Sequence, residues 1–346
     1  MIDEIHKEDM KMSVKVAING FGRIGRLAFR EMFGKPDFEI VAINDLTDAV
    51  QLAYLLRYDS SQGRYEKNIS TEGNMLVVEG VKVPVFAEKD PSNLPWKDYN
   101  VDVVLECTGH FTSRDKASLH LQAGAKKVII SAPAKDKDIP TVVFGVNETS
   151  LTGEETIISA ASCTTNCLAP IAKVLDDNFK IVKGFMTTVH AYTNDQATLD
   201  IPHPKGIYAR RGRAAAANIV PTTTGAAKAV GLVLPQLKGK LDGIALRVPV
   251  ITGSVVDLVV ELGKPVTKEE VNLAVKNAAS DTIGYTEDPI VSSDVIGITQ
   301  GTMFDALSTT ILEVDGKQMV KVITWYDNEY SFTAQMIRTL KYLAEL

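Results

Sequence analysis

Cysteine is scarce in this sequence: Cys107, Cys163 and Cys167 are the only three among 346 residues. An odd and sparse set of cysteines provides no disulfide framework and is typical of proteins in a reducing compartment. We therefore expect a cytoplasmic protein whose cysteines are free thiols.

Long hydrophobic runs are also missing. No apolar stretch reaches the roughly 18 residues that a transmembrane helix needs, so we expect no membrane span. The first twelve residues, MIDEIHKEDMKM, mix acidic and basic side chains and contain no apolar core, which argues against a secretory signal peptide. We expect residues 1–12 to form a polar N-terminal extension.

Positive charge is not in excess. The formal net charge of −6 argues against a general nucleic-acid-binding protein. One basic cluster comprises Lys205, Arg210, Arg211 and Arg213, and Tyr208 is the one aromatic residue within it that could stack on a base. We interpret this cluster as a solvated loop or a subunit contact, and we expect no nucleic-acid partner.

The length is sufficient for two domains, and the first half of the chain alternates between apolar runs and helical patterns. Strands are expected at 14–18, 39–43, 101–106, 127–131 and 141–146, and helices at 49–56 and 116–122. Gly124 stands where a glycine commonly follows the end of a helix. Such alternation predicts an α/β domain with a mostly parallel, doubly wound sheet of the Rossmann type.

The second half has longer β runs. Strands are expected at 181–192, 244–249, 254–261 and 319–325, with helices from near Cys163, from a Thr267–Glu270 capping box, and over 332–346. We predict an α/β domain over 13–161, completed by the C-terminal segment 327–346. An α+β catalytic domain with a mostly antiparallel sheet then spans 162–326.

A glycine-rich turn follows the first expected strand. Gly20–Gly25 (GFGRIG) has the G-x-G-x-x-G spacing, after a strand and before a helix, that favours a dinucleotide site. Gly20 permits the turn, Gly22 lets the backbone approach a pyrophosphate, and Gly25 allows close helix packing. Asp45 lies 25 positions beyond Gly20, near the distance of about 20 expected for the acid that binds the ribose.

The cofactor is predicted to be NAD. A carboxylate at Asp45 accepts hydrogen bonds from ribose hydroxyls and repels a 2′-phosphate, which disfavours NADP. FAD uses the same fingerprint and stays an alternative, as does a glycine turn with a solvent-facing acid.

The segment around Cys163 is a candidate nucleophile. Cys163 stands between an apolar strand and a helix, where free N–H groups and the helix dipole stabilise a thiolate. Cys167, one turn further on, is expected to be buried and unable to reach Cys163 for a disulfide. Among the five histidines, His190 in a predicted strand is the best candidate for a base, and His203 in a Pro-flanked loop is a weaker one. On spacing alone, a catalytic pair and two structural residues are equally supported.

A zinc site is disfavoured, because the cysteines have no C-x₂-C arrangement and no second Cys/His cluster is present.

Several motifs resemble those of the glyceraldehyde-3-phosphate dehydrogenase family, in family order over essentially residues 13–346. They are Asn19–Arg26 (NGFGRIGR), Tyr58–Ser60, Ile130–Ala134 (ISAPA), Ala161–Cys167 (ASCTTNC), His190–Gln196 (HAYTNDQ), Pro221–Ala227 (PTTTGAA) and Trp325–Glu329 (WYDNE). The resemblance implies a glycolytic, NAD-dependent, phosphorylating dehydrogenase. Its substrates would be glyceraldehyde 3-phosphate and inorganic phosphate, and its assembly a homotetramer.

The resemblance also implies residue roles. Cys163 would form a hemithioacetal and then a thioester, and His190 would act as base. Three further sets would bind the ligands. The substrate phosphate would lie against Thr193 and Arg247, near Asp195. The attacking phosphate would lie near Ser162, Thr164, Thr224 and Gly225. The cofactor would contact Gly20, Phe21, Gly22, Arg23, Ile24, Gly25, Asp45, Thr108, Ser131 and Asn328.

Arg247 also stands out without the resemblance. It lies in an otherwise apolar strand, where an unpaired buried arginine is costly, so an anionic ligand or a structural ion pair with an acid is expected.

Two departures from the family pattern are visible. Phe332 stands where the family often has a tyrosine near the nicotinamide, and the loop around 204–208 is longer than in common bacterial relatives. The alternatives are an erythrose-4-phosphate dehydrogenase, which shares the cysteine and histidine, and a binding protein with a vestigial site. Thr193–Gln196 and Thr222–Gly225 favour the triose enzyme, and nothing in the site looks degraded.

Overall fold

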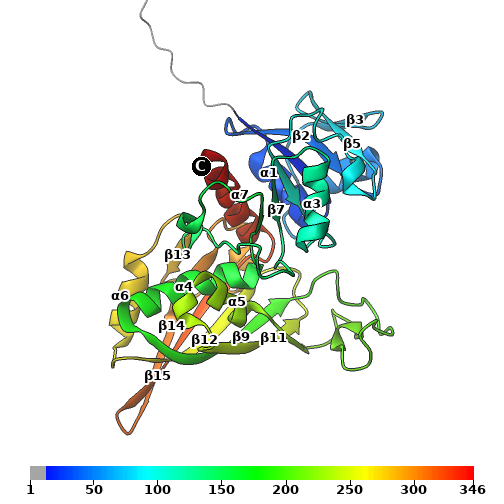
Figure 1. Ribbon diagram of the computed structural model, residues 1–346. Coiled ribbons are helices and arrows are strands. Elements are labelled where there is room, and N and C mark those ends of the chain that lie inside the picture. The colour runs from blue at the N-terminus through cyan, green and yellow to red at the C-terminus, as the bar shows by residue number, and fades with distance from the viewer. Residues whose placement is uncertain (1–12) are drawn as a thin grey trace, which may run out of the picture.

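The computed structural model describes residues 13–346, arranged as two sheets with a long helix between them (Figure 1). The extension predicted for residues 1–12 lies outside the described residues. Among the residues described, no helix is long and apolar enough to cross a membrane.

The first sheet has eight strands in the order β3-β4-β5-β2-β1-β6-β7-β8. Their bounds are β1 (Val14–Asn19), β2 (Phe38–Asn44), β3 (Ile69–Glu72), β4 (Met75–Val78), β5 (Val81–Phe86), β6 (Val103–Glu106), β7 (Lys127–Ile130) and β8 (Ile157–Ser159). The pairs from β5–β2 through β7–β8 are parallel, and the pairs β3–β4 and β4–β5 are antiparallel. The predicted parallel sheet is therefore confirmed.

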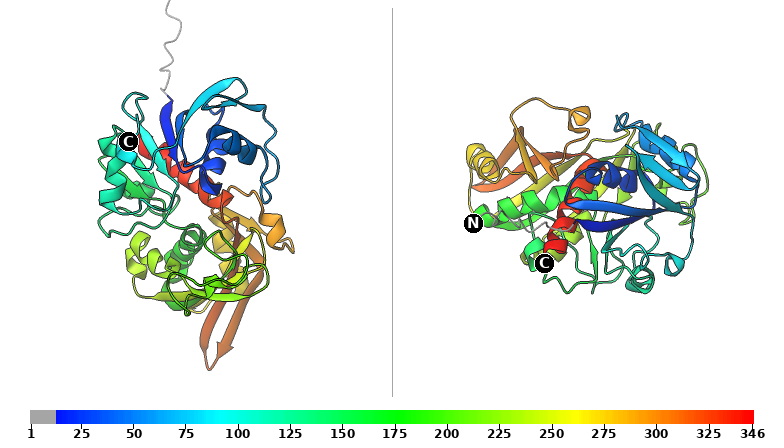
Figure 2. Two further views of the ribbon diagram at one scale, coloured as in Figure 1. Left: turned by 90° about the vertical axis from the view of Figure 1, so that its right-hand side faces the viewer. Right: turned by 90° about the horizontal axis from the view of Figure 1, so that it is seen from above.

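Helices cover both faces of the first sheet, as the continuous burial of β1 from Val16 onward requires. Val16 and Ile18 pack in the cluster that contains α1 (Arg23–Met32), α2 (Ala49–Arg57) and α7 (Tyr330–Glu345). Ala17 packs on the opposite face with α3 (Arg114–Gln122). The C-terminal helix α7 thus returns to the first sheet through Phe332, Met336 and Leu340 (Figures 1 and 2).

The second sheet has seven strands in the order β10-β11-β9-β12-β15-β14-β13. They are β9 (Ile181–Ala191), β10 (Val220–Thr223), β11 (Leu241–Val248), β12 (Ser254–Leu262), β13 (Ile283–Thr286), β14 (Thr302–Val314) and β15 (Lys317–Tyr326). The pairs β9–β11 and β13–β14 are parallel and the others antiparallel, as predicted for a mostly antiparallel sheet.

One face of the second sheet is covered by helices. These are α4 (Cys163–Phe179), α5 (Ala226–Val233) and α6 (Lys268–Asn277), which lie together in Figure 1. Met186, Val256 and Val322 point into this core, whereas Phe185 on the other face is 73% exposed. The side chains that alternate along β9 therefore divide into a buried, helix-facing set and an exposed set.

The local predictions have mixed outcomes. The capping box is present, with Thr267 accepting from the Glu270 N–H and the Glu270 carboxylate accepting from the Thr267 N–H. Gly124 follows the end of α3 with φ of +104°. The strand predicted at 141–146 is wrong: only Thr141 forms an isolated bridge, Val142 and Val143 are buried outside any strand, and residues 144–147 form a turn.

Candidate active site

The glycine-rich turn lies at the carboxyl end of β1 and leads into α1. Gly20 has φ of +90°, and a Cβ there would lie 2.8 Å from the backbone of Cys107 and Thr108. A Cβ on Gly25 would lie 2.1 Å from the Gly20 carbonyl oxygen, so neither position admits a side chain. Nothing lies within 4 Å of a Cβ on Gly22, which leaves its backbone open to a ligand.

A cavity of about 460 Å³ begins beside this turn. It is lined by Gly20, Gly22, Asp45 and Thr108, together with Asn19, Asn44, Leu46, Glu88, Lys89, Cys107, His110 and Phe111. The Asp45 carboxylate accepts from the Phe21 N–H at 2.7 Å, which ties the acid to the turn. The carboxylate at the end of β2 thus lies where the ribose of a dinucleotide is expected.

A second cavity, of about 620 Å³, continues from the first and shares Gly22 and Cys107 with it. Arg23, Ile24, Ser131 and Asn328 line it, as do Ser162, Cys163, His190 and Thr193. Together the two cavities form a groove from Asp45 to Cys163. Phe21 and Gly25 do not line it, because Phe21 is buried and Gly25 packs against Gly20.

Cys163 is the first residue of α4, as predicted. Ser162 is the N-cap, and its Oγ accepts from the Thr165 N–H at 3.1 Å. The cysteine side chain is therefore held at the positive end of a 17-residue helix. Cys107, Cys163 and Cys167 are all free, and Cys167 is fully buried against Thr302.

His190, near the end of β9, faces Cys163. Its Nε2 lies 3.5 Å from Cys163 Sγ, and its Nδ1 lies 2.6 Å from the Ala191 carbonyl oxygen. Because a carbonyl only accepts, Nδ1 carries the proton and donates it. Nε2 is then the free acceptor that faces the thiol, which is the tautomer a base requires.

Burial favours the neutral form of both partners. It raises the pKa of the Cys163 thiol, an effect that the Arg247 guanidinium opposes, and it lowers the pKa of His190 to about 3. The helix dipole that the sequence suggested as the source of a thiolate is therefore countered by desolvation. Transfer of a proton from Sγ to Nε2 leaves the net charge of the pair unchanged, so the pair can activate the thiol internally.

A third cavity, of about 230 Å³, lies beyond the thiol and shares Ser162, Cys163 and His190 with the groove. Thr164, Thr224, Gly225 and Arg247 line it. Arg247 on β11 is in register with His190 on the parallel strand β9, which brings the guanidinium beside the imidazole. Hydroxyls, an imidazole and a guanidinium are groups that bind anions, and we call this space the anion cavity.

Arg247 has no acidic partner within residues 13–346. Its Nη1 donates to the Ala191 carbonyl at 3.2 Å and to Thr193 Oγ1 at 2.9 Å, and its buried Nε has no hydrogen-bond partner. The structural ion pair considered from the sequence is not formed. An uncompensated guanidinium that faces a cavity favours an anionic ligand.

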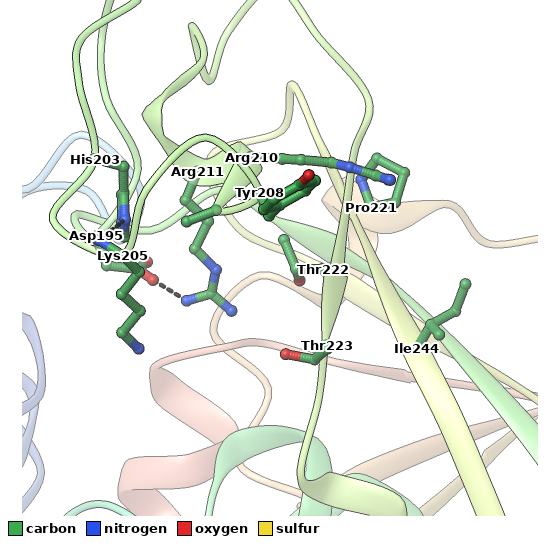
Figure 3. Close-up of a pocket in the computed structure, with 11 residues that line it drawn as sticks. Asp195, His203, Lys205, Tyr208, Arg210, Arg211, Pro221, Thr222, Thr223 and Ile244 are labelled. Atoms are coloured by element: carbon green, nitrogen blue, oxygen red, sulfur yellow. Dashed lines mark hydrogen bonds and ion pairs between the residues drawn. The ribbon is translucent and has the colours of Figure 1, made fainter.

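Asp195 does not line the groove or the anion cavity. It forms an ion pair with Arg211 and accepts from Thr193 Oγ1. Figure 3 shows the pair at the edge of a larger basic cavity of about 790 Å³, with Arg211 extending between Asp195 and Thr222. Asp195 thus orients Arg211 and Thr193 and lies outside the anion cavity.

Arg211 is a site residue that the sequence reasoning missed. It lines the anion cavity, although the sequence placed it in a basic loop cluster with exposed neighbours. The sequence separation of Arg211 from Thr193 did not predict that the two are close. They are brought together because the loop 192–219 folds back, so that Asp195 contacts both. Tyr326 was also missed: its buried hydroxyl lies 2.9 Å from Thr164 Oγ1 and 2.8 Å from Thr188 Oγ1, below the thiol.

Asn328 and Glu329 join the two sheets at the groove. Asn328 Oδ1 accepts from Ser254 Oγ at 2.6 Å, and its Nδ2, which lies 3.4 Å from His190 Nδ1, is at the wall of the groove. Glu329 accepts from Arg23 Nε at 3.1 Å and from Thr252 Oγ1 at 3.1 Å. Burial raises the pKa of Glu329, and Arg23 opposes this. Arg23 is therefore held by Glu329 and Asp59 at the edge of the groove.

The groove fits a dinucleotide better than a metal. No group of three or more His, Cys, Asp or Glu side chains with metal-binding geometry occurs in the part of the chain that the structure describes. The glycine turn, the α1 N-terminus, Asp45 and the Asn328 amide are the kinds of group that bind a pyrophosphate, a ribose and a carboxamide.

Comparison with known proteins identifies the family. Residues 14–114 match the family model for the glyceraldehyde 3-phosphate dehydrogenase NAD binding domain, and residues 162–328 match that for its C-terminal domain. The chain is 61% identical over 332 residues to glyceraldehyde-3-phosphate dehydrogenases of Clostridium pasteurianum and Clostridium acetobutylicum, covering 96% of this chain and 99% of each relative. It is 57% identical over 336 residues to that of Streptococcus pyogenes, covering 97% of this chain and 99% of the relative.

Proposed function

The chain belongs to the glyceraldehyde-3-phosphate dehydrogenase family, and on that premise we propose that it converts glyceraldehyde 3-phosphate, NAD and inorganic phosphate into 1,3-bisphosphoglycerate and NADH, as in glycolysis. One observation carries the proposal. Cys163 Sγ lies 3.5 Å from His190 Nε2, where the cofactor groove meets the anion cavity. A nucleophile, a base, a cofactor site and an anion site thus converge on one point.

The groove binds NAD along its length. Gly20, Gly22 and the N-terminus of α1 receive the pyrophosphate, with Arg23 and Ile24 at its border, and Asp45 accepts from the ribose hydroxyls. Phe21 and Gly25 support this turn from behind. Thr108 contributes to the adenosine end and Ser131 to the nicotinamide end. The Asn328 amide would hold the carboxamide of the nicotinamide in the cavity that also contains Cys163. The bound nicotinamide ring supplies the hydride acceptor.

Cys163 begins the chemistry on the aldehyde. Its proton passes to His190 Nε2 while Sγ bonds to the aldehyde carbon, which gives a hemithioacetal. Arg247 and Thr193 hold the substrate phosphate, and Asp195 keeps Thr193 and Arg211 in position. The imidazolium stabilises the oxyanion on the former carbonyl oxygen and then donates its proton to that oxygen, which returns His190 to its neutral form.

His190 then acts as the general base. Its Nε2 takes the proton from the hemithioacetal hydroxyl as hydride leaves carbon, and a thioester on Cys163 results. Inorganic phosphate, held by Ser162, Thr164, Thr224, Gly225 and Arg211, attacks the thioester carbon. The C–S bond breaks, the thiol regains a proton from His190, and the acyl phosphate leaves. Splitting one difficult reaction into two steps conserves the oxidation energy in the product.

The enzyme is further proposed to work in the cytoplasm as a homotetramer. Assembly is supported by the helix-free face of the second sheet. There Val189 on β9, Val255 on β12 and Trp325 on β15 lie in register and only partly buried, and Phe185 is exposed four residues earlier on β9. Apolar side chains exposed on one sheet face are typical of a subunit contact. Sedimentation equilibrium of the purified chain tests this part, and a monomer at micromolar concentration would contradict it.

The activity is tested by following NADH formation with glyceraldehyde 3-phosphate and NAD. Sustained turnover should require inorganic phosphate. Turnover that continues without phosphate would mean hydrolysis of the thioester. No reaction with the triose, but reaction with erythrose 4-phosphate, would assign the chain to that related dehydrogenase.

A further inference from the structure

The residue two positions before the nucleophile has a strained backbone. Ala161 has φ of +62°, in the left-handed region that residues with a Cβ rarely adopt. Four other non-glycine residues of the described chain have positive φ, namely Glu79, Asn100, Lys180 and Asp315, and all four are exposed. Ala161 is 1% exposed and has no polar side chain with which to support its own turn.

Such a conformation persists only where the surroundings enforce it. Two buried polar side chains surround Ala161. Ser159 Oγ accepts from the Ala161 N–H at 3.1 Å and donates to the Ala132 carbonyl at 2.7 Å. Asn166 Nδ2 donates to the Ala160 carbonyl at 2.9 Å and to the Ser162 carbonyl at 3.0 Å. The Ala161 N–H and the carbonyls of Ala160 and Ser162 therefore each have a side-chain hydrogen-bond partner.

The Asn166 amide bridges the two carbonyls that flank the strained residue. It comes from the first turn of α4, the same turn that carries Cys163. Ser159 is the last residue of β8, and its other partner, Ala132, lies in the wall of the cofactor groove. Ser159 is fully buried and Asn166 is 2% exposed, so neither contacts a ligand directly.

The turn determines where the helix begins. β8 belongs to the first sheet, α4 covers the second, and Ala160–Ser162 is the whole connection between them. A left-handed residue reverses the chain direction sharply there and places Ser162 at the N-cap. A change of φ at Ala161 would therefore move Cys163 relative to His190, which is fixed on β9.

We propose that Ser159 and Asn166 are positioning residues for the nucleophile. They hold Ala161 in its left-handed conformation and thereby hold Cys163 Sγ within reach of His190 Nε2. The inference rests on the proposed function only in treating Cys163 as the nucleophile.

The test uses thiol chemistry, which needs no substrate. The probe is iodoacetamide, and the readout is the rate of Cys163 carboxamidomethylation between pH 5 and 9, followed by mass spectrometry on the full-length protein. Asn166→Ala should lower the rate at neutral pH about tenfold, because two hydrogen bonds are lost. It should also shift the pH profile to higher pH, because the thiol is less well paired with His190.

Rescue distinguishes positioning from general destabilisation. Glycine adopts positive φ without a steric penalty, so Asn166→Ala combined with Ala161→Gly should recover at least about threefold of the lost rate. The kcat of the double variant should recover in parallel, while the KM for NAD changes little in either variant. A variant that is only less stable would not regain its pH profile when a glycine is added.

The other end of the same helix provides matched controls. Asn178 Nδ2 donates to the Val174 carbonyl at 2.8 Å, and Lys180 has φ of +63°. Asn178→Ala and Lys180→Gly repeat the two substitutions far from the thiol. They should change the urea midpoint and leave the alkylation profile unchanged.

Ser159→Ala is the second test variant, in case Asn166→Ala does not fold. It should also slow alkylation and be rescued by Ala161→Gly. An unchanged alkylation profile in the folded variant, or no recovery on adding the glycine, would overturn the proposal. A failure of the triose oxidation assay with the alkylation results as expected would instead overturn the proposed function alone.

Discussion

The cofactor groove and the anion cavity meet at Cys163, yet they are built in different ways. The groove is built around the glycine turn between β1 and α1, with Gly22 where its two cavities meet. The anion cavity is built from side chains of β9, β11, the start of α4 and the loop that carries Arg211, with His190 and Arg247 in register on neighbouring strands.

This difference determines how the groove and the anion cavity each tolerate substitutions. A backbone site depends on where glycine permits a turn, so a single added Cβ can close it. A side-chain site depends on charge and hydrogen bonding in a buried space, so the loss of one group leaves others unpaired. Substitutions should therefore separate cofactor binding from chemistry.

The largest effect on activity is expected at Cys163, where the groove and the anion cavity meet. Cys163→Ser should reduce the rate of NADH formation by on the order of 10⁴-fold, because the nucleophile is lost. The Kd for NAD, measured by calorimetry, should change less than twofold. Cys167→Ser, one turn along α4, is the control and should retain activity. A comparable loss of activity in both variants would show that the rate depends on the integrity of α4 and not on the Cys163 thiol.

A smaller effect is expected in the anion cavity. Arg247→Gln removes a charge that has no protein counterion, so the KM for glyceraldehyde 3-phosphate should rise about 10- to 100-fold. The KM for NAD should stay within about twofold. Arg114→Gln, which breaks an ion pair with Asp138 on the first domain, is the control. An equal rise in the KM values for glyceraldehyde 3-phosphate and NAD would contradict the separation of the anion cavity from the cofactor groove.

The acid stability of the protein should depend on His190. Burial lowers its pKa to about 3 in the folded chain, from the ordinary value of 6.5. Between these values the unfolded chain binds a proton that the folded chain does not, so stability falls as the pH falls from 6.5 toward 3. The slope from one proton is at most about 1.4 kcal/mol per pH unit.

His190→Asn should remove this part of the slope. Urea unfolding at pH 7, 6 and 5 measures it, with His110→Asn, at an exposed histidine, as the control. Equal slopes in the wild type and in His190→Asn would show that the imidazole is not kept neutral by burial.

The smallest effect is expected at the far end of the groove. Asp45→Ala should relax the preference for NAD over NADP about tenfold, since the carboxylate no longer binds the ribose or repels a 2′-phosphate. The ratio of kcat/KM for the two cofactors measures it. Glu39→Ala, an exposed acid on the same strand, should leave the ratio unchanged. Unchanged selectivity in Asp45→Ala would mean that the ribose is recognised elsewhere.

The groove and the anion cavity also differ in how far the sequence predicts them. The groove follows from local pattern: a strand, a glycine turn and a helix place Gly20–Gly25 and Asp45 without knowledge of the rest of the chain. The start of α4 at Cys163 follows in the same way from the apolar strand before it and the helical run after it.

The anion cavity depends on contacts between distant segments. The pairing of His190 with Arg247 arises from the parallel register of β9 and β11, which no local pattern encodes. Arg211 reaches the cavity only because the loop 192–219 folds back, and Ala161 carries no sign of its left-handed φ. The long strand β14 was not predicted, because its burial does not alternate regularly.

The central claim is that Cys163 carries the oxidised substrate as a thioester until phosphate releases it. Rapid mixing of the NAD-loaded protein with glyceraldehyde 3-phosphate, without inorganic phosphate, tests it most directly. A thioester intermediate should give a burst of one NADH per chain and a covalent acyl adduct on Cys163 that disappears when phosphate is added. Steady NADH formation with no burst, or an adduct on another residue, would contradict it.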